Sequence, residues 1–207
     1  MFIEDFTNNY IDLQPRPQSL ALGKNEIFIG SEKDLVYKLN CKTLQPEKIF
    51  ETESNHSISQ IYADTVNDNV FFNSIKFNIL NKNNQIKSEF SIAIKDVKKV
   101  DDKYFSFAAS GLVGIFYIDK NLKSNWDFIY EKNKNVNFSG FNQVALLINT
   151  NGKSTEYNAI NNTIYYATNN GLIAVTNDGK NKELKHNNET LFLIKIQKYK
   201  DKIIGLS

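Results

Sequence analysis

Apolar and polar positions alternate in short runs along most of the chain, and Asn, Asp, Gly and Lys separate one run from the next. Runs of β-branched and aromatic residues occupy, for example, residues 26–30, 103–107 and 163–168. A period of two residues is typical of a β-strand that buries one of its faces. No stretch longer than two helical turns repeats its apolar residues at the spacing of a helix. The pattern therefore predicts an all-β protein.

A repeated pattern lies over these predicted strands. When Asn25, Asp102 and Asn162 are aligned, a leucine follows ten residues later in each copy, and no gap is needed. A tight hairpin turn needs a residue that tolerates a positive φ. The residues of that type just before the leucine are Asp34, Gly111 and Gly171. A fourth and looser copy begins at Asp68.

Each copy extends on both sides into a unit of four predicted strands joined by turns. The first strands are predicted at residues 19–22, 58–63, 94–100 and 155–160. The last strands are predicted at residues 47–51, 86–90, 126–131 and 182–186. Four-stranded antiparallel units that recur about every 40 residues are typical of the blades of a β-propeller.

The predicted organisation is an N-terminal extension, residues 1–18, followed by a β-propeller over residues 19–207. Residues 132–152 are an insertion, whose strand-like segment belongs either to an extra hairpin or to a degenerate blade. Because the last unit stops in mid-blade, we expect an incomplete propeller whose remaining blades or signalling domains lie outside this chain. The alternative is that the last two strands close against the N-terminal segment. The predicted blades are residues 19–52, 57–91, 94–131 and 154–187, with a half-blade at 190–207.

The charge of the chain argues against two classes of partner. The formal net charge is +2, and Arg16 is the single arginine, whereas phosphate and guanine recognition relies on the planar guanidinium. The longest apolar runs, residues 112–118 and 144–148, are too short to span a membrane. No secretory signal is visible in the first ten residues. We therefore expect neither a nucleic-acid partner nor a membrane span in this chain.

Few residues offer catalytic or metal-binding chemistry. Cys41 is the single cysteine, and the two histidines have no partner at the spacing of a metal site. Residues 152–155, Gly-Lys-Ser-Thr, are predicted to form a turn, because the first glycine of a phosphate-binding loop is missing. The carboxylate pair Asp64 and Asp68 lies in a predicted turn between strands. The sequence therefore predicts no catalytic residue, no cofactor and no metal site.

Residues 164–172, which read Ile-Tyr-Tyr-Ala-Thr-Asn-Asn-Gly-Leu, are followed by the turn Asn-Asp-Gly-Lys at 177–180. This segment resembles the two-component regulator propeller repeat, and residues 27–31 and 202–207 look like its first half. The resemblance implies a ligand-sensing domain, periplasmic or extracellular, attached to a bacterial sensor kinase or transcriptional regulator. Similar propellers occur in cell-surface and secretion-associated proteins of Bacteroidetes.

The leading hypothesis is a non-enzymatic propeller that binds a small molecule or a glycan. Ligands of propellers bind at the central channel or on one rim, where loops from several blades converge. The aligned hairpin tips therefore give the candidate ligand-binding residues Ser31, Asp34, Ser110, Asn169 and Asn170. The alternatives are a propeller that docks a partner protein as a scaffold, and a glycan-acting or lyase-type propeller enzyme.

Overall fold

The computed structural model describes residues 13–81, 83, 86–90, 93–101, 104–117, 147–148, 150–176 and 180–207. These residues form strands, turns and irregular segments, and none of them is helical. The predicted all-β fold class is thus confirmed. The chain separates into two compact units, and the division falls within the second sheet. Unit 1 comprises Met1–Ile75 and Leu80–Gln85, and unit 2 comprises Lys76–Ile79 and Ile86–Ser207.

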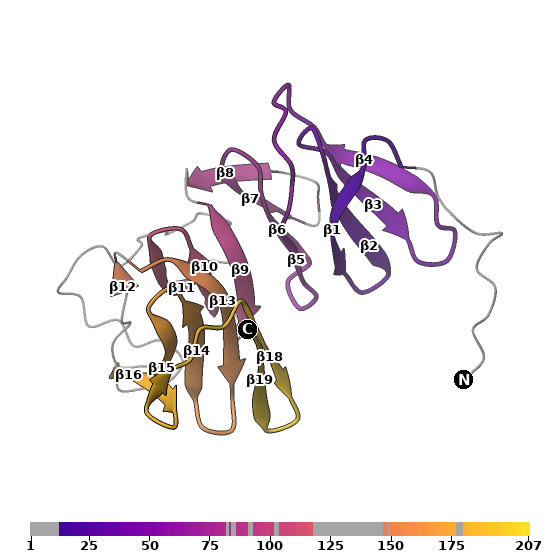
Figure 1. Cartoon of the computed structure of the whole chain (residues 1–207). Coiled ribbons are helices and arrows are strands. Elements are labelled where there is room, and N and C mark those ends of the chain that lie inside the picture. The colour runs from indigo at the N-terminus through magenta and orange to yellow at the C-terminus, as the bar shows by residue number, and fades with distance from the viewer. Residues whose placement is uncertain are drawn as a thin grey trace, which may run out of the picture. The chain divides into compact units, whose positions relative to one another are not determined.

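The first two sheets each contain four strands in chain order, so that every strand pairs with the next one along the sequence. The first sheet consists of β1 (Pro17–Leu22), β2 (Glu26–Ser31), β3 (Val36–Asn40) and β4 (Pro46–Phe50). The second consists of β5 (Ile61–Asp64), β6 (Asn69–Asn73), β7 (Phe77–Leu80) and β8 (Ile86–Phe90). Figure 1 shows the first sheet as an up-and-down meander, which is the architecture of a propeller blade.

Two further sheets and a hairpin follow in unit 2. The third sheet contains β9 (Ile94–Lys99), β10 (Tyr104–Ala109), β11 (Leu112–Tyr117) and β12 (Leu147–Ile148). The fourth contains β13 (Gly152–Asn158), β14 (Thr163–Thr168), β15 (Gly171–Thr176), β16 (Asn181–His186) and β17 (Glu189–Thr190). The hairpin consists of β18 (Lys195–Tyr199) and β19 (Lys202–Leu206). It lies beside β13, and β13 and β18 are in contact (Figure 1).

The repeat predicts a positive φ at the aligned position in the turn between the second and third strands of a sheet, and the structure confirms it. Asp34 has φ 52°, Gly111 has φ 88° and Gly171 has φ 114°. The three aligned positions therefore all adopt a positive φ, which explains why Gly or Asp occupies them.

The third sheet differs from the expectation at its outer edge. The strand predicted at residues 126–131 lies outside the described residues. Among the residues that the structure describes, β12 takes the position next to β11, with Leu112 opposite Ile148. This strand comes from the segment that the sequence assigned to the insertion.

Each unit has its own hydrophobic core, formed by the inward side chains of the strands. In unit 1, Phe28 and Val36 of the first sheet pack with Ile58, Val70 and Phe72. In unit 2, the core contains Ala108, Val113, Ile115, Ile164 and Tyr166. Alternate residues of a strand point to opposite faces, so these strands bury one row of side chains against the neighbouring sheet.

Candidate functional site

The five residues predicted at the hairpin tips lie in two different environments. Ser31 and Asp34, in unit 1, are fully buried, whereas Ser110, Asn169 and Asn170, in unit 2, are exposed. A role for these residues in ligand binding stays a prediction.

The buried Asp34 holds the connection between β4 and β5. Its carboxylate Oδ2 accepts a hydrogen bond from the Thr52 hydroxyl at 2.9 Å, and its backbone N–H donates to the carbonyl oxygen of His56 at 2.7 Å. Asp34 Oδ1 and Ser31 Oγ are buried, and no described residue forms a hydrogen bond with either atom. Burying polar atoms in this way costs free energy, and it distinguishes this turn from the other aligned turns.

The exposed tips of unit 2 are joined by asparagine side chains. Asn169 Oδ1 accepts a hydrogen bond from the backbone N–H of Asn151 at 2.8 Å. Asn151 Oδ1 in turn accepts one from the backbone N–H of Gly111 at 2.8 Å. The structure therefore brings together the turn that contains Ser110 and the turn that contains Asn169 and Asn170. The side chain of Asn151 connects the third and fourth sheets in this arrangement, and the side chain of Asn169 holds Asn151.

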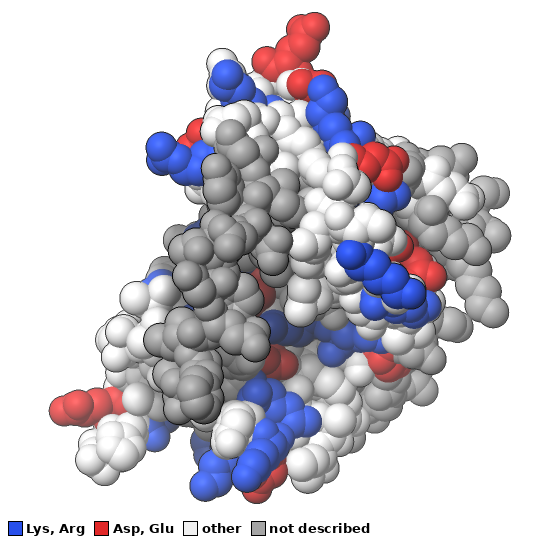
Figure 2. Space-filling view, turned by 90° about the vertical axis from the view of Figure 1, so that its right-hand side faces the viewer, with Lys and Arg blue, Asp and Glu red and all other residues white. Residues whose placement is uncertain are grey.

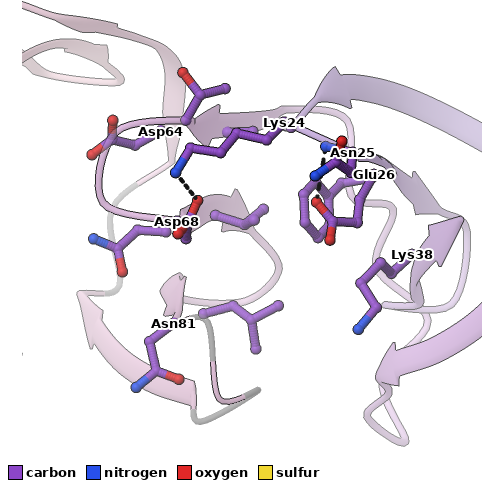
Figure 3. Close-up of a pocket in the computed structure, with 14 residues that line it drawn as sticks. Lys24, Asn25, Glu26, Lys38, Asp64, Asp68 and Asn81 are labelled. Atoms are coloured by element: carbon purple, nitrogen blue, oxygen red, sulfur yellow. Dashed lines mark hydrogen bonds and ion pairs between the residues drawn. The ribbon is translucent and has the colours of Figure 1, made fainter. Parts of the chain in front are cut away.

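Unit 1 contains a polar pocket of about 240 Å³ at the end of the first two sheets where β2 begins and β5 ends (Figure 3). Ser31, at the other end of β2, does not line it. The carboxylate pair Asp64 and Asp68 lines this pocket, and no local pattern of the sequence indicates the cavity. The pocket is lined by Gly23, Lys24, Asn25, Glu26, Phe28, Lys38, Ala63, Asp64, Thr65, Asp68, Asn69, Val70, Leu80 and Asn81.

The floor of the pocket is apolar and its walls are polar. Phe28, Val70 and Leu80 belong to the core of unit 1. Lys38 lies directly opposite Phe28 in the β2–β3 register, so both side chains lie on the same face of the first sheet. Polar residues from the turns and strand ends surround this floor. Ligand pockets in proteins commonly combine an apolar lining with a few polar groups in this way.

Most charged groups of the pocket are already paired within the protein. Lys24 Nζ lies 3.0 Å from Asp68 Oδ1 (Figure 3). Lys38 Nζ lies 2.9 Å from Oε2 of Glu47, a residue that does not line the pocket. The carboxylate of the buried Asp64 accepts hydrogen bonds from the Val66 backbone N–H at 3.1 Å and the Asn67 amide at 2.7 Å. Asp64 therefore stabilises its own turn.

Glu26 is the exception among these charged groups. Its Oε2 atom accepts a hydrogen bond from the Asn25 backbone N–H at 3.3 Å. No lysine or arginine of the described residues forms an ion pair with it. Glu26 thus brings an uncompensated negative charge to the pocket wall.

A second polar cluster connects the inner strands of unit 2. The carboxylate oxygen Oδ2 of Asp96, on β9, accepts three bonds from other elements. The donors are the Ser154 hydroxyl at 2.6 Å, the Thr155 backbone N–H at 3.1 Å and Lys195 Nζ at 2.8 Å. Asp96 therefore ties β9 to β13 and to the start of β18.

The Gly-Lys-Ser-Thr segment at 152–155 was predicted to be a turn, and this prediction is wrong. Residues 152–155 begin β13, and Gly152 lies opposite Thr168 in the register with β14. A Cβ atom on Gly152 would lie 2.5 Å from Val113 Cγ1 and 2.9 Å from Ala108 Cα. Glycine is thus needed for the close approach of two sheets, and Ser154 and Thr155 provide hydrogen bonds to Asp96.

A second cavity, of about 400 Å³, lies between the fourth sheet and the β18–β19 hairpin. Its walls are largely apolar, with Leu172, Leu184, Leu193 and Ile203 among the lining residues. Asp201 is its single charged lining residue. Of the two cavities, the pocket of unit 1 therefore offers more groups that can recognise a polar ligand.

The surface carries charges of both signs. On the face shown in Figure 2, lysines and acidic side chains lie next to one another in several places. No described helix has the length and hydropathy to cross a membrane. Within the described part of the chain, no group of three or more His, Cys, Asp or Glu residues could hold a metal ion.

Solved structures share this fold at low sequence identity. The extracellular domain of BT4673, a one-component or hybrid two-component system protein of B. thetaiotaomicron, matches 94% of this chain at 12% identity and a TM-score of 0.66. Virginiamycin B lyase from Staphylococcus aureus matches 92% at 11% identity and a TM-score of 0.65. The chain spans 27% of the length of the BT4673 structure and 63% of the lyase structure.

The extracellular domain of a one-component or hybrid two-component system protein and a lyase are thus both similar in structure to this chain. The likeness to extracellular domains of BT4673 agrees with the two-component regulator propeller resemblance of the sequence. Neither a protein-family model nor a curated protein matches the sequence. The meander sheets and the shared architecture together establish an all-β, propeller-like fold.

Proposed function

We propose that this chain is part of a periplasmic or extracellular sensory β-propeller of a signal-transduction protein. In this proposal, a small polar ligand binds without being converted in the pocket of unit 1. The observation that carries the proposal is the pocket itself, in which charged and amide groups surround an apolar floor. The structural likeness to the extracellular domain of BT4673 supports the signalling role.

Ligand binding is tested by thermal unfolding of the purified chain with a panel of neutral sugars, sugar acids, amino acids, amines and nucleosides. A ligand that binds only the folded state raises the unfolding temperature in a saturable way. We expect at least one compound of the panel to do so.

Two matched variants place the ligand in the pocket. Thr65 and Thr43 are both exposed and both lie between strands of unit 1, but only Thr65 lines the pocket. Thr65→Phe is expected to abolish the rise in unfolding temperature, and Thr43→Phe to preserve it. A ligand effect that survives Thr65→Phe would overturn the assignment of the pocket.

Two further measurements test the other parts of the proposal. Mass spectrometry of the ligand after incubation is expected to show the unchanged compound, whereas a product would favour a lyase or another enzyme. Fractionation of the source cells is expected to recover the chain outside the cytoplasm. Recovery in the cytoplasmic fraction would contradict the sensory role at the cell envelope.

A further inference from the structure

The charge pairs of the pocket narrow the chemistry of its ligand. Lys24 and Lys38 are the two cations among the lining residues, and each already has a carboxylate partner, at 3.0 Å and 2.9 Å. An anionic ligand would have to compete with Asp68 or Glu47 for these lysines. The pocket is therefore poorly suited to a phosphate or a carboxylate.

The acidic groups of the pocket outnumber the basic ones. The lining residues include three carboxylates, Glu26, Asp64 and Asp68, against two lysines. Asp68 faces Lys24, and Asp64 is held by two donors of its own turn. Glu26 is left as the carboxylate that pairs with no lysine or arginine of the described residues, and it lies at the pocket wall beside Asn25 (Figure 3).

The remaining walls suit hydroxyl groups. The amides of Asn25, Asn69 and Asn81 line the pocket, and an amide both donates and accepts hydrogen bonds. The cavity of about 240 Å³ is smaller than most drug-sized ligand sites, which measure about 300–1,000 Å³. A ligand of the size of one sugar ring or one amino acid matches this volume better than an oligosaccharide does.

We infer that the ligand of this pocket is a small hydroxylated amine that carries a positive charge, and that Glu26 accepts a hydrogen bond from its ammonium group. This inference rests on the proposed ligand-binding function and specifies its chemistry. The apolar floor, formed by Phe28 and Leu80 among others, contacts the carbon skeleton of the ligand. The amides bind its hydroxyl groups.

Four related probes test the charge of the ligand at pH 6.5: glucosamine, N-acetylglucosamine, glucose and glucuronate. They share a sugar ring and differ in charge. Isothermal titration calorimetry is expected to show saturable binding of glucosamine, with affinity at least about tenfold higher than for glucose and N-acetylglucosamine. This factor corresponds to the lower end of the contribution of a charge-assisted hydrogen bond. Glucuronate is expected to bind most weakly.

Matched variants then test the residue. Glu26→Gln removes the charge but keeps the size of the side chain, and it is expected to lower the affinity for glucosamine about tenfold without changing that for glucose. Glu53→Gln is the control, because Glu53 is exposed and does not line the pocket. Lys24→Met removes one of the two cations of the pocket, and it tests whether this lysine binds glucuronate.

The outcomes separate this inference from the proposed function. Equal affinities for glucosamine and glucose, or an affinity for glucosamine that Glu26→Gln leaves unchanged, would overturn the inference. If glucuronate binds more tightly than glucosamine and Lys24→Met abolishes this binding, the inference is also overturned. The proposed function, ligand binding in the pocket, would then still hold. If the four probes do not bind but another compound of the panel does so in the pocket, only the inference fails. If no compound binds, both fail.

Discussion

Asp96 on β9 and Ser154 on β13 share a hydrogen bond of 2.6 Å, although 58 residues separate them in the sequence. Asp96 is 8% exposed and Ser154 is fully buried. The same carboxylate oxygen also accepts the backbone N–H of Thr155, so one acidic side chain organises the start of the neighbouring strand.

We expect Asp96→Ala to lower the free energy of unfolding by about 2–3 kcal/mol, because the buried donors of Ser154 and Thr155 lose their acceptor. Lys195 is half exposed, with a side-chain exposure of 47%. Lys195→Met is therefore expected to cost less than about 1 kcal/mol. Urea-induced unfolding of both variants measures the difference. Equal losses would show that the carboxylate acts only through its ion pair with Lys195.

Tyr166 makes the stability sensitive to alkaline pH. Its side chain is buried, its hydroxyl donates to the Gly114 carbonyl oxygen at 2.8 Å, and burial raises its pKa far above the usual value. The folded state therefore keeps the proton above about pH 10, where tyrosines of the unfolded chain ionise. Below this pH, the contribution of Tyr166 to the free energy of unfolding is complete. Above it, the free energy of unfolding is expected to fall by about 1.4 kcal/mol per pH unit from this residue.

Tyr166→Phe tests this effect. The variant is expected to lose about 1 kcal/mol near pH 7, since the Gly114 carbonyl loses its partner. Between pH 10 and 12, its free energy of unfolding is expected to fall less steeply than that of the original chain. The other tyrosines are common to both proteins, so parallel curves in this range would contradict the assignment.

Gly171 and Gly111 occupy equivalent hairpin turns but differ in their surroundings. A Cβ atom on Gly171 would lie 2.7 Å from Thr190 Cγ2, whereas one on Gly111 would have no atom within 4 Å. Gly111→Ala is expected to cost about 1–3 kcal/mol through its backbone alone. Gly171→Ala is expected to cost more, because Thr190 must also move.

The pKa of Glu183 reports on the movement of Thr190. The Thr190 hydroxyl lies 2.7 Å from Glu183 Oε1, and this hydrogen bond is the largest cause that lowers the pKa of Glu183. In Gly171→Ala, the pKa of Glu183 is expected to rise towards that of a free glutamate, as followed by NMR titration. The same titration on Gly111→Ala is expected to show no change.

Asp34 combines a buried charge with a positive φ. Asp34→Asn keeps an acceptor for Thr52 and tolerates φ 52°, while it removes the charge from the buried carboxylate. We expect this variant to be as stable as the original chain or more stable by up to about 1 kcal/mol. Asp34→Ala is expected to lose about 2 kcal/mol through the hydrogen bond and the backbone. A large loss in both variants would indicate that the charge itself is required.

The sequence by itself determined the all-β fold class and the hairpin turns at the three aligned positions. The period of two residues identifies the strands because alternate side chains of a strand point to opposite faces. Aligning Asp34, Gly111 and Gly171 identified the turns because a positive φ restricts the residue type at a single position. Both properties depend on residues that are close together in the chain, and a repeated pattern makes them visible.

Only the tertiary structure decided which polar residues share a site. Glu26 and Asp68 line one pocket, although they are 42 positions apart in the sequence. Ser31 lies on the same strand as Glu26 but does not line this pocket. Gly152 looked like a turn residue, yet the close approach of Val113 requires it inside a strand. Pocket walls and hydrogen bonds between sheets depend on how sheets pack, and no local pattern of residues records that packing.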